Sequence, residues 1–275
     1  MTVRGRSWRK AGVASGLAAL GIGMNAPAAS GIIVEYPADS SATAVARAMA
    51  VDKSVIRRAV FSAVPPGSKP AAVATTPLAG FPRPFAGSSY AILTTGNARL
   101  ADDANSSGDA GSTAGGPSIR GARDVTIMRI DLRIPKNANC LSFRFRFLSD
   151  EYPEFVGDDF NDAFIAELDE SNWSAATKED PRISAPRNFA VTSNRQPIRI
   201  NRVGATGMTA FRARGTTYDG ATRILRASTR VNQATRHLYL SIFDQGDRSY
   251  DSAVFMDKLI IGRRSSCTNG VVVDS

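Results

Sequence analysis

Hydrophobic and polar residues alternate along three segments in the second half of the chain. From 141 to 147, Leu141 and three phenylalanines alternate with Ser142, Arg144 and Arg146, and segments 126–134 and 238–242 have the same period of two. Such a period buries one face of a strand and leaves the other in water, as in antiparallel sheets. Weaker segments of this kind, separated by turn residues, are 91–95, 163–168, 189–192, 198–203, 209–214 and 254–261. The pattern predicts a mainly β fold, an antiparallel two-sheet sandwich similar to a jelly roll.

The segment Ser41 to Phe61 has a helical period instead. Val45, Met49 and Val51 fall near one face of a helix. One or two short N-terminal helices are therefore expected. Several prolines then interrupt regular structure up to Tyr90.

The N-terminal residues have the pattern of a secretory signal peptide. A basic stretch is followed by a short apolar run, Ala11 to Met24, and by the small-residue pattern Ala26-Pro27-Ala28. We expect a signal peptide over 1–28, a linker over 29–40, one β domain over 41–262 and a C-terminal tail over 263–275. A membrane-anchored N-terminal helix and a disordered tail are the alternatives. No later apolar segment is long enough to span a membrane, so the mature chain is expected to be secreted and extracellular.

Two cysteines are present, Cys140 and Cys267. Cys140 begins a strong predicted strand and Cys267 follows the last one, so a bridge would join strands that are distant in the chain. A disulfide persists in an oxidising extracellular compartment. We predict the bridge, with two free buried thiols as the alternative.

The formal net charge of +9 is unevenly distributed. The segment from Asp150 to Asp180 is rich in acidic residues, whereas the segment from Arg182 to Arg236 is rich in arginine. The two blocks could pair within the fold, or the arginines could form a solvated face. A module that binds polyanions is a third hypothesis, ranked lowest because the arginines are scattered over several predicted strands. Nucleic-acid binding is not expected.

Two loops crowded with carboxylates directly follow predicted strands. The strands ending near Ser149 and Asp244 are expected to lie side by side and to deliver both loops to one rim. Calcium binds six to eight oxygen ligands, and flexible acidic loops suit it. The candidate ligands of a calcium ion are Glu151, Asp162, Asp244, Asp247 and Asp251. Alternatively, these side chains cap turns or pair with the arginine block.

The same carboxylates allow a second hypothesis, an extracellular carbohydrate-active hydrolase. Glycoside hydrolysis needs two carboxyl groups at a defined separation, which Glu151 or Glu154 with Asp247 or Asp251 would supply. A nucleophile–histidine device would have to use His237, which is the only histidine. The sequence has no G-x-S-x-G, P-loop or H-E-x-x-H motif. No catalytic residue is therefore assigned, and a non-enzymatic protein is favoured.

Both acidic segments resemble the choice-of-anchor L domain family of secreted and surface-attached bacterial proteins. The first reads SDEYPEFVG over 149–157 and then FNDAF over 160–164; the second reads IFDQGDRSYDSAVF over 242–255. A shorter element of the family is LTTGNA over 93–98. Asp150 stands where the family usually has Glu. The resemblance implies a β-rich extracellular module for adhesion or for surface and matrix interaction, whose ligand would be a glycan or a surface protein, and it brings no established catalytic residues.

Overall fold

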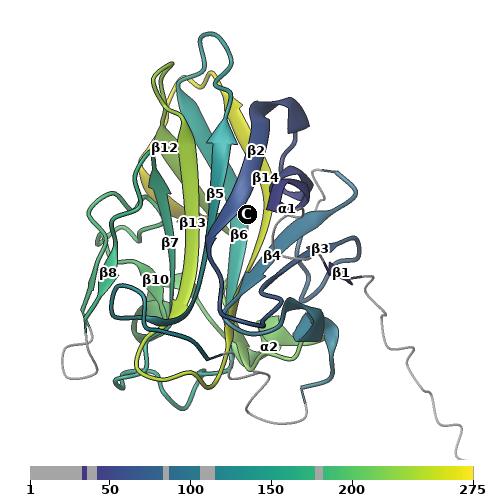
Figure 1. The fold of residues 1–275 in the computed structure, drawn as a ribbon, viewed down its shortest axis with the longest axis vertical. Coiled ribbons are helices and arrows are strands. Elements are labelled where there is room, and N and C mark those ends of the chain that lie inside the picture. The colour runs from purple at the N-terminus through teal and green to yellow at the C-terminus, as the bar shows by residue number, and fades with distance from the viewer. Residues whose placement is uncertain (1–32, 36–41, 83–86, 106–114, 177–181, 275) are drawn as a thin grey trace, which may run out of the picture.

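The computed structural model describes residues 33–35, 42–82, 87–105, 115–176 and 182–274. Two antiparallel sheets face each other as a sandwich, with few short helices at the edges (Figure 1). The predicted fold class is confirmed. The expected signal peptide and its cleavage site lie outside the described residues.

Within the described residues, the larger sheet has eight strands in the order β1-β3-β4-β14-β6-β12-β15, with β11 also paired to β6. Their bounds are β1 Ile33–Glu35, β3 Ala71–Ala74, β4 Tyr90–Thr94, β6 Cys140–Ser149, β11 Gly220–Ala221, β12 Leu225–Arg230, β14 Ser252–Gly262 and β15 Gly270–Val273. The long strands β6 and β14 form the centre of this sheet.

The smaller sheet has five strands in the order β10-β7-β13-β5-β2. Their bounds are β2 Ile56–Ala63, β5 Arg123–Leu132, β7 Ala163–Leu168, β10 Ile198–Arg199 and β13 His237–Asp244. A separate two-stranded ribbon pairs β8 (Ser174–Ala175) with β9 (Ile183–Ser184).

The core between the sheets follows the alternation in the sequence. Phe143, Phe145 and Phe147 of β6 are fully buried in the main hydrophobic cluster. The ring of Phe164, from the facing sheet, lies 5.2 Å from that of Phe145 between centroids. Arg144 lies between two of these phenylalanines in β6 and so belongs to the opposite face of the strand.

The helix expected over Ser41 to Phe61 is only partly present. Helix α1 covers Ala42–Ala48, a 3-10 turn η1 covers Lys53–Val55, and the rest is strand β2. The side chain of Asp52 caps the turn by accepting a hydrogen bond from the Ser54 amide at 2.9 Å. After this turn, the chain pairs with β5 as an edge strand, where Arg58 contacts Asp131. Pairing with β5 therefore makes this segment a strand, although its sequence has a helical period.

Three of the weaker predicted strands were wrong in whole or in part. Segment 198–203 is a strand only in β10 and continues as the 3-10 helix η3 (Ile200–Thr206), and 189–192 contains a single bridge at Val191. Segment 209–214 contains helix α2, Ala210–Ala213. The Arg212 guanidinium donates to the Gly207 carbonyl and to the Thr209 hydroxyl, which closes a turn where a strand was expected. Strands β3, β12 and β15 were not predicted.

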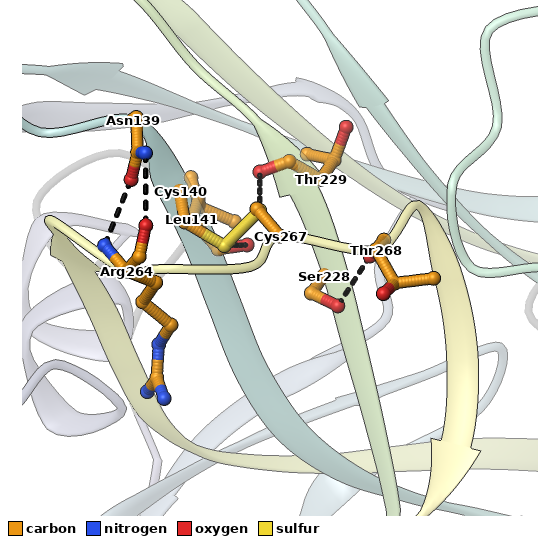
Figure 2. The surroundings of a disulfide bond; sticks show 8 residues. All are labelled: Asn139, Cys140, Leu141, Ser228, Thr229, Arg264, Cys267 and Thr268. Carbon is orange, nitrogen blue, oxygen red and sulfur yellow. Dashed lines mark hydrogen bonds between the residues drawn. A yellow bond between two sulfur atoms is a disulfide. The ribbon is translucent and has the colours of Figure 1, made fainter.

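The disulfide between Cys140 and Cys267 is present, as predicted (Figure 2). It ties the start of β6 to the segment after β14.

The residues expected to form a C-terminal tail include β15, which extends the larger sheet by pairing with β12. Between β4 and β5, the chain forms a 3-10 helix, η2 (Ala98–Asp102). Within the described residues, no helix has the length and apolar character needed to cross a bilayer.

Candidate functional site

The two acidic loops meet at one end of the sandwich, the lower end in Figure 1. The first loop runs from β6 to β7, and the second runs from β13 to β14. Ser252, which begins β14, pairs with Ser149 at the end of β6, and Phe243 pairs with Ala163 at the start of β7. The strands ending at Ser149 and Asp244 do not lie side by side, because they belong to different sheets. The loops converge because both cross between the sheets at this end, the first from the larger sheet to the smaller and the second from the smaller to the larger.

All five carboxylates predicted as ligands lie at this end, and we call them the carboxylate cluster: Glu151, Asp162, Asp244, Asp247 and Asp251. Glu151 and Asp251 are only 1% and 2% exposed, and Asp162 and Asp244 are fully buried. Asp247 is partly buried. Burying a carboxylate is costly unless it is paired, protonated or bound to a cation.

Asp162 lies at the centre of the cluster. Its Oδ2 accepts a hydrogen bond from the Ser252 hydroxyl at 2.7 Å, and its Oδ1 accepts one from the Gln245 amide at 3.2 Å. The Asp162 amide in turn donates to Glu151 Oε2 at 3.3 Å. One carboxylate therefore links both acidic loops to the start of β14.

Asp244 and Glu151 contain buried oxygens that accept no hydrogen bond. Both carboxylate oxygens of Asp244 lack a hydrogen-bond partner, and so does Oε1 of Glu151. Each of these two groups lies close enough to the Asp162 carboxyl to share a proton with it. When ionised, two facing carboxylates have no hydrogen between them, so only a shared proton or a cation can stabilise the contact.

The pKa values of these groups reflect that arrangement. Burial raises the pKa of Asp162 to about 8. Burial, and then the charge of Asp162, raise the pKa values of Glu151 and Asp244 well above the usual range. Within the described parts of the chain, no lysine or arginine forms an ion pair with Glu151, Asp162 or Asp244. These three carboxyl groups thus have no basic partner, and they favour the protonated form unless a cation is bound.

Hydroxyl groups from three strands support the cluster. The Thr95 hydroxyl donates to Asp251 Oδ1 at 3.0 Å and accepts from the Ser252 amide at 3.0 Å. The hydroxyl oxygens of Ser149 and Ser252 lie within hydrogen-bond distance, 2.9 Å apart, and Ser149 Oγ accepts a hydrogen bond from the Glu151 amide. At Gly96 a Cβ atom would overlap the Asp251 carboxylate, so glycine is required for this close approach. The LTTG element of the sequence is therefore part of the site.

Asp247 lies at the partly open side of the cluster. Its Oδ1 accepts a hydrogen bond from the Ser249 amide at 3.1 Å, which is a local turn cap. Its charge also raises the pKa values of Glu151 and Asp162. Turn capping, which the sequence offered as the alternative to a ligand role, is thus present for this residue.

The carboxylates are not already arranged around a single point. Among the described residues, no three or more histidine, cysteine, aspartate or glutamate side chains have a geometry that could hold a metal ion as they stand. A cation at this site would therefore require side-chain rotations.

The sequence missed some residues of the site. Asp150 is 1% exposed, and its amide donates to the Asp251 carbonyl at 3.1 Å. The serines at 149 and 252 flank the two acidic motifs, so their position in the sequence was a usable signal. Glu154, considered as a catalytic partner, is exposed.

His237, which a nucleophile–histidine device would use, lies at the opposite end of β13 from Asp244. His237 Nδ1 lies 2.9 Å from Asp131 Oδ1 on the smaller sheet, and Asp131 also contacts Arg58 and Arg129. A cavity of about 470 Å³ involves Tyr218 and Asp219, and no residue of the carboxylate cluster lines it. Glu151 and Asp162 are covered by protein.

Comparisons with known proteins give one result. No curated protein and no solved structure matches the chain significantly. A family model described as the Choice-of-anchor L domain matches residues 80–259, which is more than half of the chain. The matched region includes β4, both acidic loops and most of β14. The chain therefore belongs to the choice-of-anchor L domain family.

Proposed function

We propose that this protein is a non-enzymatic surface or secreted module for adhesion, in which the carboxylate cluster binds a calcium ion. Family membership supports the coarser part, a surface or secreted module. The Cys140–Cys267 disulfide is consistent with an extracellular compartment. Calcium and adhesion are our inference from the chemistry of the cluster.

One observation carries the calcium proposal. The buried carboxyl groups of Glu151 and Asp244 each lie beside that of Asp162, and neither oxygen of Asp244 forms a hydrogen bond of ordinary geometry. Calcium takes carboxylate, carbonyl and water oxygens in flexible geometry. Asp247 and Asp251 would add ligands from the second loop. Zinc and other transition metals prefer imidazole and thiolate ligands, which the cluster does not contain.

A bound cation would connect the two sheets at this end. Glu151 and Asp162 flank the first loop, and Asp244, Asp247 and Asp251 span the second. A shared ion would hold both loops in one arrangement and so fix the surface that they form. That surface is where we place contact with a glycan or a surface protein.

The hydrolase alternative has less support. Two of the four carboxylates considered for it, Glu151 and Asp251, are covered by protein, whereas a glycosidase must bring both carboxyl groups against the sugar. A panel of glycan substrates would detect hydrolysis, and a bell-shaped pH profile would favour the hydrolase over the binding module.

Isothermal titration calorimetry with calcium, on the chain from Ala29, tests the proposal. The wild type should bind saturably, and Asp244→Asn should bind at least about tenfold more weakly, because it removes a charged ligand. Asp103→Asn, at an exposed aspartate outside the cluster, is the matched control and should bind as the wild type does. Flat heats in all three proteins would contradict the proposal.

A further inference from the structure

A second charged region lies on the outer face of the larger sheet, toward the opposite ends of β6 and β14. Arg144 of β6 pairs in register with Arg226 of β12 on one side and Asp257 of β14 on the other. Directly paired residues share a face of a sheet. The phenylalanines that alternate with Arg144 face the core, so this row lies on the outside.

Two adjoining cavities form a groove along this row. One has a volume of about 230 Å³ and the other about 160 Å³, and Ser142, Arg226 and Arg264 line both. Arg144 and Lys258 line the second, and the cysteines of the disulfide line the first. We call this the basic groove, after its charged and hydroxyl side chains: Ser142, Arg144, Arg226, Lys258 and Arg264.

Covalent and backbone contacts hold the groove in place. The amide of Arg264 donates to Asn139 Oδ1 at 2.9 Å, and Asn139 Nδ2 donates back to the Arg264 carbonyl at 3.0 Å (Figure 2). The Arg264 side chain runs away from the disulfide. Lys258 has a φ of 56° at an irregularity in β14 between Asp257 and Ile260, which changes the direction of its side chain.

The groove already holds one carboxylate of the chain itself. Arg144 contacts Asp274, and Arg226 Nε lies 3.7 Å from Asp274 Oδ1. Within the described residues, the side chains of Lys258 and Arg264 have no acidic partner, and the Ser142 hydroxyl has no hydrogen-bond partner. Asp274 therefore neutralises part of the groove, and two cations and a hydroxyl in the same cavity have no such partner.

We propose that the basic groove binds the acidic groups of an extracellular polysaccharide. Guanidinium and ammonium groups recognise carboxylate and sulfate groups, and the hydroxyls of Ser142, Ser228 and Thr268 suit sugar oxygens. The one aromatic residue in the lining, Phe143, is buried, so the groove has no platform for stacking nucleic-acid bases. The choice of a polysaccharide rests on the extracellular placement in the proposed function, and the groove itself is separate from the carboxylate cluster.

Binding to immobilised polysaccharides tests this inference. The probes are polygalacturonate for carboxylates and dextran sulfate for sulfates, with unmodified dextran as the neutral reference. Wild type should bind at least one acidic probe, and Lys258→Ala/Arg264→Ala should bind it at least about tenfold more weakly. Lys53→Ala/Arg57→Ala removes the same charges at exposed positions outside the groove and should change affinity less than about twofold.

A further variant gives a gain that misfolding would not produce. Asp274→Asn should strengthen binding, because it releases Arg144 and Arg226 from their internal partner. Equal losses in the two double variants would overturn the inference, since they would indicate diffuse attraction to a chain of net charge +9. No binding to either acidic probe, or groove-dependent binding of single-stranded DNA alone, would also overturn it. All assays are run with calcium and with chelator, so that failure of the groove is distinguished from failure of the calcium site.

Discussion

Strands β6 and β14 carry opposite charges at their two ends. At the Ser149–Ser252 end they meet the carboxylate cluster, and farther along the same pair they carry the cations of the basic groove. The acidic groups are buried and repel one another, whereas the basic groups line an open groove and are partly neutralised by Asp274. Burial therefore determines which region needs an added ion.

This contrast has a physical basis. A solvated ammonium or guanidinium group is stable without a partner, so Lys258 and Arg264 impose little cost on the fold. A buried carboxylate such as Asp244 must be protonated or bound to a cation. The cluster should therefore affect stability, and the groove should affect only recognition.

Loss of the disulfide should have the largest effect and should separate the two regions. The bridge joins residues 127 apart in sequence, so Cys140→Ala/Cys267→Ser should lower the free energy of unfolding by about 4–5 kcal/mol. Acidic-polysaccharide binding should also weaken, because Arg264 and β15 lose their tether. Calcium titration of the folded variant should match the wild type. Denaturant unfolding and both binding assays check this, and lost calcium binding with intact polysaccharide binding would contradict it.

A methyl group at Gly96 should disturb the cluster alone. Gly96→Ala places a Cβ against the Asp251 carboxylate and should cost about 1–3 kcal/mol through overpacking, with weaker calcium binding. Gly87→Ala is the control, because a Cβ there meets no atom within 4 Å. Thermal unfolding and calorimetry measure both effects. Equal stability of the two variants would mean that this close approach is unimportant.

The pH dependence of the calcium-free protein should give the smallest effect. The folded pKa of Asp162 is about 8, against 3.8 for an ordinary aspartate, so the folded state binds a proton that the unfolded state has lost. Stability is then greatest below the unfolded pKa and is lost as the pH rises through about 8. From pH 6 to pH 7 in chelator, the free energy of unfolding should fall by about 1 kcal/mol. Excess calcium should remove this slope, and Asp244→Asn should reduce it; a rise in stability would contradict the account.

Much of this architecture was readable in the sequence. The alternation of Phe143, Phe145 and Phe147 predicted β6 and its buried face, and the two cysteines predicted the bridge. The acidic motifs identified all five residues that the structure brings to one end. Local sequence patterns are enough to predict a strand where burial alternates regularly, and to predict site residues where these are concentrated in one segment.

The rest depended on tertiary pairing. Strand β2 followed a helical pattern and became an edge strand because β5 offers it a partner. Strand β12 buries few large residues, and β15 exists as an addition to it, so neither has a strong local signal. The basic groove combines side chains of β6, β12 and β14 with the segment after β14, and no single stretch of sequence indicates it. Convergence of the acidic loops likewise required the crossing from one sheet to the other.

Thermal unfolding of the wild type in excess calcium and in chelator, near neutral pH, tests the central claim most directly. At calcium about one hundred times the dissociation constant, the linkage relation gives about 2.7 kcal/mol of stabilisation, which corresponds to a rise in Tm of about 5–10 °C for a domain of this size. Asp244→Asn should lose most of that rise and should melt higher than the wild type in chelator, because a repelling charge is gone. Identical melting of the wild type in the two conditions would contradict a calcium ion in the carboxylate cluster.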